Sequence, residues 1–151
     1  ETDKLQTLAL SVKLFGENNI IVFGDSLCAY YDTNGVFINS YVYKRKLVDY
    51  SSDGSLAALI FSNEERRTSE LVTISCADGT VSEKTLDREA LNIQVSGDTV
   101  YVQTKNGIES RTAAGDIISS AELDSDYEGF LRMGKYVYLL GYDEINRIDY
   151  N

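Results

Sequence analysis

Short apolar runs alternate with polar turns along the whole chain, and the same order of segments occurs four times. Each copy has a turn, a densely apolar strand and a second strand, and the first three continue through a turn rich in Asp, Asn or Gly into a more polar strand. The densely apolar strands are residues 19–23, 56–61, 100–102 and 136–140. A strand that is apolar at nearly every position is typical of a sheet covered on both faces.

Two independent sets of glycines give the length of the repeat. The glycines before the apolar strand lie 43 and 37 residues apart, and they are Gly54, Gly97 and Gly134. The glycines before the polar strand lie 44 and 36 residues apart, and they are Gly35, Gly79 and Gly115. Both spacings are near the ~40–45 residues of a four-stranded propeller blade.

Each copy also has a candidate first strand ahead of its apolar strand, at residues 12–15, 47–50, 91–95 and 130–133. With this strand each copy becomes an antiparallel meander. Such small sheets are marginal alone and must cover their apolar faces by stacking on neighbours. We therefore expect an all-β fold, a β-propeller-type array of about four four-stranded antiparallel blades. It would form a small ring or part of a larger propeller.

We expect a single domain over residues 1–151. Its approximate blades are residues 12–43, 46–87, 90–123 and 128–151. The last copy lacks a fourth strand, which residues 5–10 would supply as a clasp unless they continue as one long strand. Three arrangements stay open: a ring that closes alone, part of a larger ring, and two chains that associate through their open blade edges.

The composition narrows the chemistry. The formal charge is −10 and the chain has no His. Because an acidic surface repels phosphate backbones, we expect no nucleic-acid partner. Without His, the commonest general base and metal ligand are missing, and the acidic turn at 32–35 lacks the later carboxylates of a calcium loop. We expect no catalytic residues, no metal and no cofactor, and we expect Cys28 and Cys76 to be unlinked thiols.

No apolar run approaches the length that crosses a bilayer, so we expect no membrane insertion by this fragment. The longest apolar stretch, residues 56–61, suits a buried strand. Because the first residue is Glu1 and not Met, we expect the chain to be part of a longer protein. A leader or anchor of that protein would lie outside the sequence.

The candidate binding residues follow from the blade topology, which places the connections between blades and the turns between second and third strands on one face. Binding commonly uses such a loop-rich face. Five basic residues and three further polar residues fall there: Lys44, Arg45, Lys46, Arg66, Arg67, Asp124, Asp126 and Tyr127. The basic residues suit a carboxylate or phosphate on a partner. The alternative is a solvated loop whose charges are balanced by Glu64, Glu65 and Glu70.

The order of turn, apolar strand, short strand, Asp/Asn-Gly turn and polar strand resembles the quinoprotein-like and WD40-like propellers. The Gly-His and Trp-Asp signature of WD40 repeats is absent, and the lack of Trp argues against quinone-cofactor chemistry. The sequence pattern is also similar to that of an uncharacterised propeller-like family of Gram-positive bacteria, domain of unknown function 5711. That resemblance implies an N-terminal membrane anchor and a propeller outside the cell.

These observations favour a non-catalytic interaction scaffold, extracytoplasmic or membrane-anchored in the parent protein, that binds a protein or a cell-surface polymer. One alternative is a hydrolase or lyase that acts through paired carboxylates at the mouth of the ring, which requires a buried acidic pair near the axis. The other alternative is a purely structural segment of a larger propeller.

Overall fold

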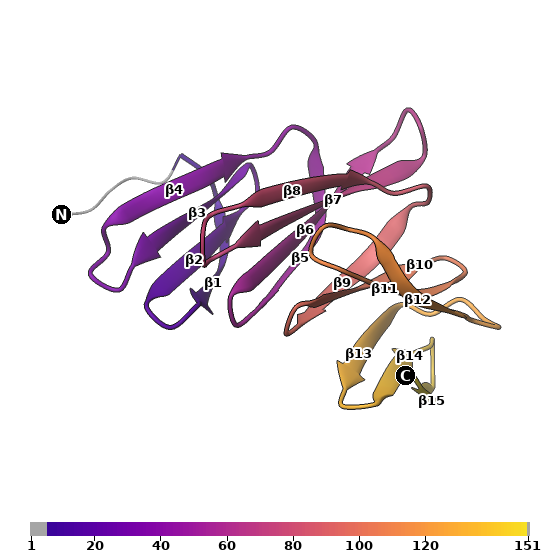
Figure 1. The fold of residues 1–151 in the computed structure, drawn as a ribbon. Helices are drawn as coiled ribbons and strands as arrows, with labels where there is room; N and C mark the ends of the chain where they lie inside the picture. The colour runs from indigo at the N-terminus through magenta and orange to yellow at the C-terminus, as the bar shows by residue number, and fades with distance from the viewer. Residues whose placement is uncertain (1–5, 151) are drawn as a thin grey trace.

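The computed structural model describes residues 6–150, in which strands and turns alternate without a helix. The strands form four antiparallel sheets that follow one another along the chain (Figure 1). The first sheet contains β1 (Ala9–Phe15), β2 (Asn19–Gly24), β3 (Leu27–Asp32) and β4 (Phe37–Val42). The second contains β5 (Lys46–Asp53), β6 (Leu56–Asn63), β7 (Thr68–Ser75) and β8 (Val81–Thr85). The third contains β9 (Ala90–Ser96), β10 (Thr99–Thr104), β11 (Gly107–Arg111) and β12 (Ile117–Glu122), and the fourth contains β13 (Gly129–Met133), β14 (Tyr136–Leu140) and β15 (Ile145–Asp149).

Within each sheet the strand order follows the sequence, so every sheet is a meander of hairpins. The first strands of successive sheets lie against each other: β1 contacts β5, β5 contacts β9, and β9 contacts β13. Because the sheets meet at these strands, they radiate from a common line in the manner of propeller blades. The expected all-β array of antiparallel meanders is confirmed, with three strands in the fourth sheet among the described residues.

The turns explain why this sequence forms hairpins at these places. Between first and second strands, φ lies between 54° and 68° at Gly16, Gly54, Gly97 and Gly134. Between third and fourth strands, φ lies between 68° and 91° at Gly35, Gly79 and Gly115. Glycine is favoured in this region because it has no Cβ. At Gly115 a Cβ would also come within 2.6 Å of the Lys84 side chain.

Apolar cores fill the spaces between successive sheets. The core between the first and second sheets includes Ile21, Phe23, Cys28, Leu59 and Val72. The core between the second and third includes Leu56, Ile60, Leu71, Val100 and Val102. The core between the third and fourth includes Tyr101, Ile108, Val137 and Leu139. Each inner sheet therefore contributes its two faces to two different cores, and the stack depends on its neighbours.

The four sheets form an open arc. Figure 1 shows the first and fourth sheets at opposite ends of the molecule, and none of the cores in the described residues joins them. Of the segment 5–10 considered as a clasp, residue 5 lies outside the described residues. Ala9 and Leu10 begin β1, which pairs with β2 in the first sheet.

Candidate functional site

The loop face is the side of the stack formed by the connections between sheets and the turns between second and third strands. An up-and-down meander places these segments at the same end of every sheet. The connections are residues 43–45, 86–89 and 123–128, and the turns are 25–26, 64–67, 105–106 and 141–144. All eight predicted binding residues lie on this face or at its border, where Lys46 is the first residue of β5.

A basic groove of about 320 Å³ lies on the loop face of the second sheet. Its walls are Lys44, Arg45, Lys46, Ser62, Asn63, Glu64 and Glu65. The two walls meet because Lys46 and Ser62 are cross-strand neighbours in β5 and β6. Arg66 and Arg67 belong to the same turn but do not line the groove, and Arg67 has a positive φ of 51°, which is uncommon outside glycine.

Two acidic residues, Glu70 on β7 and Glu83 on β8, hold one wall of the basic groove. Lys44 Nζ lies 2.9 Å from Glu83 Oε1, and Tyr41 donates its hydroxyl hydrogen to the same oxygen at 2.9 Å. Arg45 Nε donates to Glu70 Oε1 at 3.1 Å. These hydrogen bonds from Lys44 and Tyr41 lower the pKa of Glu83, and burial, followed by the contact with Glu83, raises the pKa of Tyr41.

Three predicted cations differ from Lys44 and Arg45, because no ion pair is found for them among residues 6–150. They are Lys46, Arg66 and Arg67. All three side chains are exposed. The turn pattern identified the cations. It did not indicate Glu83 as a partner of Lys44, because the two residues are 39 positions apart. The balancing residues expected from sequence were Glu64, Glu65 and Glu70, and of these Glu70 forms an ion pair.

A second depression of about 260 Å³ lies on the loop face at the third and fourth sheets. It is lined by Glu89, Leu91, Lys105, Asp126 and Tyr127. Gln103 donates its Nε2 hydrogen to the backbone oxygen of Tyr127 at 2.8 Å, which anchors this loop. The depression shares no lining residue with the basic groove, and Asp124 lines neither. The structure therefore separates the predicted residues into two places on one face.

Two carboxylates on β5, a first strand, connect the second sheet to the third. Asp49 Oδ2 accepts a hydrogen bond from Ile93 N at 2.9 Å, and Asp53 Oδ2 accepts one from Gly97 N at 2.8 Å. Burial raises the pKa of Asp49. Four residues along a strand correspond to roughly 13 Å, so Asp49 and Asp53 are not a close carboxylate pair of the kind that glycosidases use.

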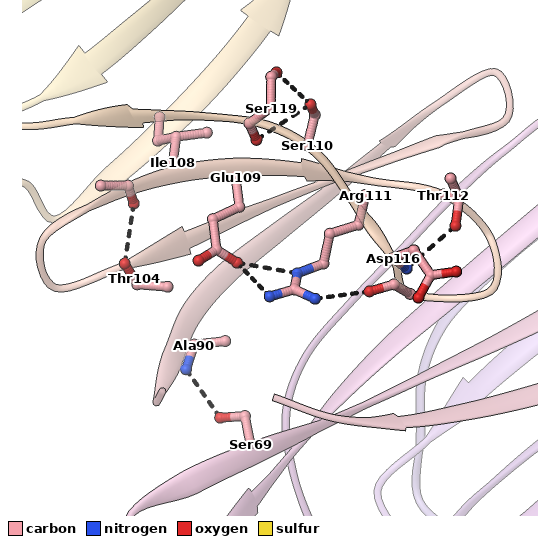
Figure 2. A network of polar contacts seen from close by, with 12 residues as sticks. Ser69, Ala90, Thr104, Ile108, Glu109, Ser110, Arg111, Thr112, Asp116 and Ser119 are labelled. Carbon is pink, nitrogen blue, oxygen red and sulfur yellow. Dashed lines mark hydrogen bonds and ion pairs between the residues drawn. The ribbon is translucent and has the colours of Figure 1, made fainter. Parts of the chain in front are cut away.

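A buried ion pair lies at the junction of the second and third sheets (Figure 2). Glu109 and Arg111, both labelled on the ribbon of β11, are 7% and 4% exposed. Arg111 Nη2 donates to Glu109 Oε2 at 2.7 Å, and Arg111 Nη1 donates to Gly115 O at 2.7 Å. Removing one partner would leave a buried charge without its counterion. The pair therefore fixes the turn between β11 and β12.

Within the described part of the chain, no group of three His, Cys, Asp or Glu side chains is placed to hold a metal ion. None of its elements is a helix long and apolar enough to cross a membrane. Cys28 and Cys76 are free thiols, Cys28 buried and Cys76 partly exposed. Cys76 Sγ donates to Phe15 O at 3.1 Å, so this thiol joins the second sheet to the first.

Comparison with known proteins shows the fold. No family model matches the chain, and no curated protein matches it. Among solved structures, BamB from Moraxella catarrhalis is 17% identical with a TM-score of 0.69, over 97% of this chain and 48% of BamB. The Pan2 WD40 domain of Neurospora crassa is 14% identical with a TM-score of 0.61, over 85% of this chain and 40% of that one.

The computationally designed Ika4 protein is 9% identical with a TM-score of 0.72, over 100% of this chain and 96% of Ika4. The chain thus spans about half the length of the natural structures it matches. These likenesses confirm the expected propeller-type architecture and its resemblance to WD40-like repeats. The resemblance to domain of unknown function 5711 stays a hypothesis.

Proposed function

We propose that this protein is a non-catalytic interaction scaffold that binds a protein partner through its loop face. The observation that supports this function is the basic groove, which forms where β5 and β6 and their flanking loops meet. Residues 44–46 form one wall and residues 62–65 form the other. Glu83 pairs with Lys44, and Glu70 pairs with Arg45. A stack of hydrogen-bonded sheets supplies the rigid frame that such loops need.

The groove favours an acidic group on the partner. Lys46 is exposed and has no ion pair among residues 6–150, so its three donors are available to a carboxylate or phosphate. The chain as a whole carries a formal charge of −10, and its long-range field repels acidic partners. Recognition must therefore depend on short, charge-assisted hydrogen bonds within the groove, and we expect a local acidic motif on the partner.

The first prediction concerns Lys46→Glu. We expect this variant to bind an acidic peptide motif roughly 10- to 100-fold more weakly, since a charge-assisted hydrogen bond contributes about 1.5–3 kcal/mol. The measurement is binding of the whole chain to an array of peptides with and without clustered carboxylates and phosphates, followed by titration of the peptides retained. Lys135→Glu is the matched control because it makes the same charge change in an exposed turn on the opposite side of the stack.

Two outcomes of this titration count against the groove. Equal weakening by Lys46→Glu and Lys135→Glu would show that only net charge matters. The second outcome is a failure of the wild-type chain to retain any acidic peptide. In either case the groove would be a solvated surface with no role in recognition.

The scaffold proposal includes a location outside the cytoplasm and a cell-surface polymer as the alternative partner. The location is supported by the resemblance to the Gram-positive propeller-like family, and the polymer is a partner that such a location would make accessible. Fractionation of the source organism tests the location, and recovery of the parent protein in the cytoplasm would exclude it. A glycan array probed with the chain tests the polymer. The variant Lys46→Glu, probed on the same array, shows whether any binding depends on the basic groove.

A further inference from the structure

The two ends of the arc expose apolar sheet faces. The leading face is the side of the first sheet that points away from the second sheet. Its exposed residues include Val12, Leu14, Phe37 and Val42, which are 59%, 73%, 49% and 63% exposed. The trailing face is the side of the fourth sheet that points away from the third. Its exposed residues include Leu131, Met133, Leu140 and Ile145, at 50%, 58%, 49% and 71%.

Equivalent positions inside the stack are buried. Counted from the glycine of the first turn, Val12 and Leu14 correspond to Ile93 and Val95 of the third sheet. Ile93 and Val95 are only 7% and 4% exposed because the second sheet covers them. By the same count Leu140 corresponds to Ile60, which is fully buried against the third sheet. Both end faces therefore have the character of a sheet interface that lacks its neighbour.

The first strand of the trailing face fits the leading face in particular. At the internal junctions, the position of Leu131 is occupied by Ser51 and Gln94. Ser51 Oγ accepts from Val95 N at 2.9 Å, and Gln94 Oε1 accepts from Arg132 N at 2.6 Å. Leu131 can form neither bond, so β13 requires an apolar surface opposite it. The side chains of Val12 and Leu14 on β1 provide such a surface.

The length of the arc matches half of a closed ring. The chain aligns with 48% of BamB, so two arcs together have about the length of that natural protein. Ika4 is matched over 96% of its length, so it has about the length of one arc. A head-to-tail contact that closes satisfies every interface. In this arrangement the trailing face of each copy meets the leading face of the other, and a two-fold axis runs along the ring axis.

We propose that two copies of this chain associate head to tail through their leading and trailing faces and close one ring of eight sheets. The charges are compatible with this contact. Among residues 6–150, no charged side chain is on the leading face, and the trailing face carries Arg147 and Asp149. Because each copy has a formal charge of −10, the copies repel each other at long range. Screening by salt should strengthen the association.

The second prediction is the oligomeric state of the chain and of three variants. Sedimentation over a range of concentrations should give wild-type particles of twice the 16.8 kDa chain mass, with tighter association as salt is raised. Leu14→Asp and Leu131→Asp should each raise the dissociation constant on the order of 100-fold or more, because each places an unpaired charge in both interfaces. Ile118→Asp should have no effect, since Ile118 is 57% exposed on β12 in the middle of the arc.

Mixing the two face variants tests the head-to-tail arrangement. A mixture of Leu14→Asp and Leu131→Asp chains contains one interface with two intact faces, whereas each variant alone has a charge in both interfaces. The mixture should therefore associate more tightly than either variant. Circular dichroism checks that each variant is folded, and the dependence of the wild-type melting temperature on protein concentration provides a measurement without mutation.

Three outcomes would overturn the proposal. One is a folded wild-type chain that stays monomeric at every concentration, which would assign the end faces to further sheets of a longer polypeptide or to another protein. Another is weakening by Leu14→Asp but not by Leu131→Asp, because that pattern belongs to pairing of two leading faces. The third is a mixture that associates no better than its components.

Discussion

At the scale of single residues, the buried thiol of Cys28 carries a pH prediction. Burial raises the pKa of Cys28 from 9.0 to about 11. A raised pKa in the folded state means that the associated stability is present below pH 9 and is lost as the pH rises to about 11. Burial, as the largest cause, also raises the pKa values of Tyr41 and Tyr43. We therefore expect the free energy of unfolding to fall steadily on the alkaline side.

The variant that isolates this effect is Cys28→Ala. At pH 8 it should be roughly 1 kcal/mol less stable than wild type, because a small buried group is removed. The difference should shrink toward pH 11, where wild type has lost the contribution of its protonated thiol. Urea unfolding under reducing conditions at several pH values measures this. A difference that stays constant from pH 8 to pH 11 would mean that Cys28 titrates as it does in the unfolded chain.

Residue-scale contacts also mark the limit of what the sequence predicts. The exposed positions of Lys44 and Arg45 followed from the turn pattern, because the blade topology alone places them on the loop face. Their partners Glu83 and Glu70 did not follow, since any of 24 acidic residues could satisfy a lysine until the register of β5 to β8 is known. The buried pair of Glu109 and Arg111 was missed for a related reason, because the polar strand pattern of β11 gives no sign of burial.

At the scale of elements, side chains of β5 join the second sheet to the third. Ser51 Oγ accepts a hydrogen bond from Val95 N at 2.9 Å. Ser51→Ala leaves this partly buried amide without an acceptor, which should cost about 1–3 kcal/mol of unfolding free energy. Ser52→Ala is the matched control. Its side chain has no hydrogen bond among the described residues, so we expect a change within about 0.5 kcal/mol.

Denaturant unfolding of both serine variants measures the difference. Equal losses in Ser51→Ala and Ser52→Ala would show that removal of a hydroxyl from β5 matters and the contact with β9 does not. The polar contacts of β5 could not be inferred from the sequence. The alternation of Asp49, Ser51 and Asp53 is typical of a strand with one solvent-exposed face. Only the stacking of the sheets shows that this face is turned toward β9.

The strands themselves were predictable because the pattern that encodes them is local. A glycine at each first turn and a dense apolar strand after it recur in all four copies, and the structure buries Leu59, Val102 and Leu139 as the middle of these strands requires. Which segment would complete the fourth sheet, which has three strands among the described residues, was not predictable in the same way. A clasp from the N-terminus needs a long-range pairing, and in the structure Ala9 pairs with Gly24 of β2.

At the scale of the whole molecule, the arc should not be equally stable along its length. Each sheet of a stacked array is stabilised by its neighbours, and the end sheets have one neighbour where the inner sheets have two. Every residue of β6 from Leu56 to Phe61 is buried, whereas β1 is exposed over most of its length. Amide hydrogen exchange should therefore be slowest in β6 and β10 and fastest in the first and fourth sheets.

Association of two copies predicts how this gradient changes with concentration. Covering the leading and trailing faces gives each end sheet its second neighbour, so dilution or Leu14→Asp should speed exchange in β1 and β14 while β6 keeps its rate. Exchange monitored by mass spectrometry at high and low protein concentration separates the two effects. A gradient that is present but independent of concentration would retain the stacked array and refute its closure by a second copy. Uniform exchange across the four sheets would contradict the stacked array itself, because it would mean that the sheets unfold as one unit whatever their neighbours.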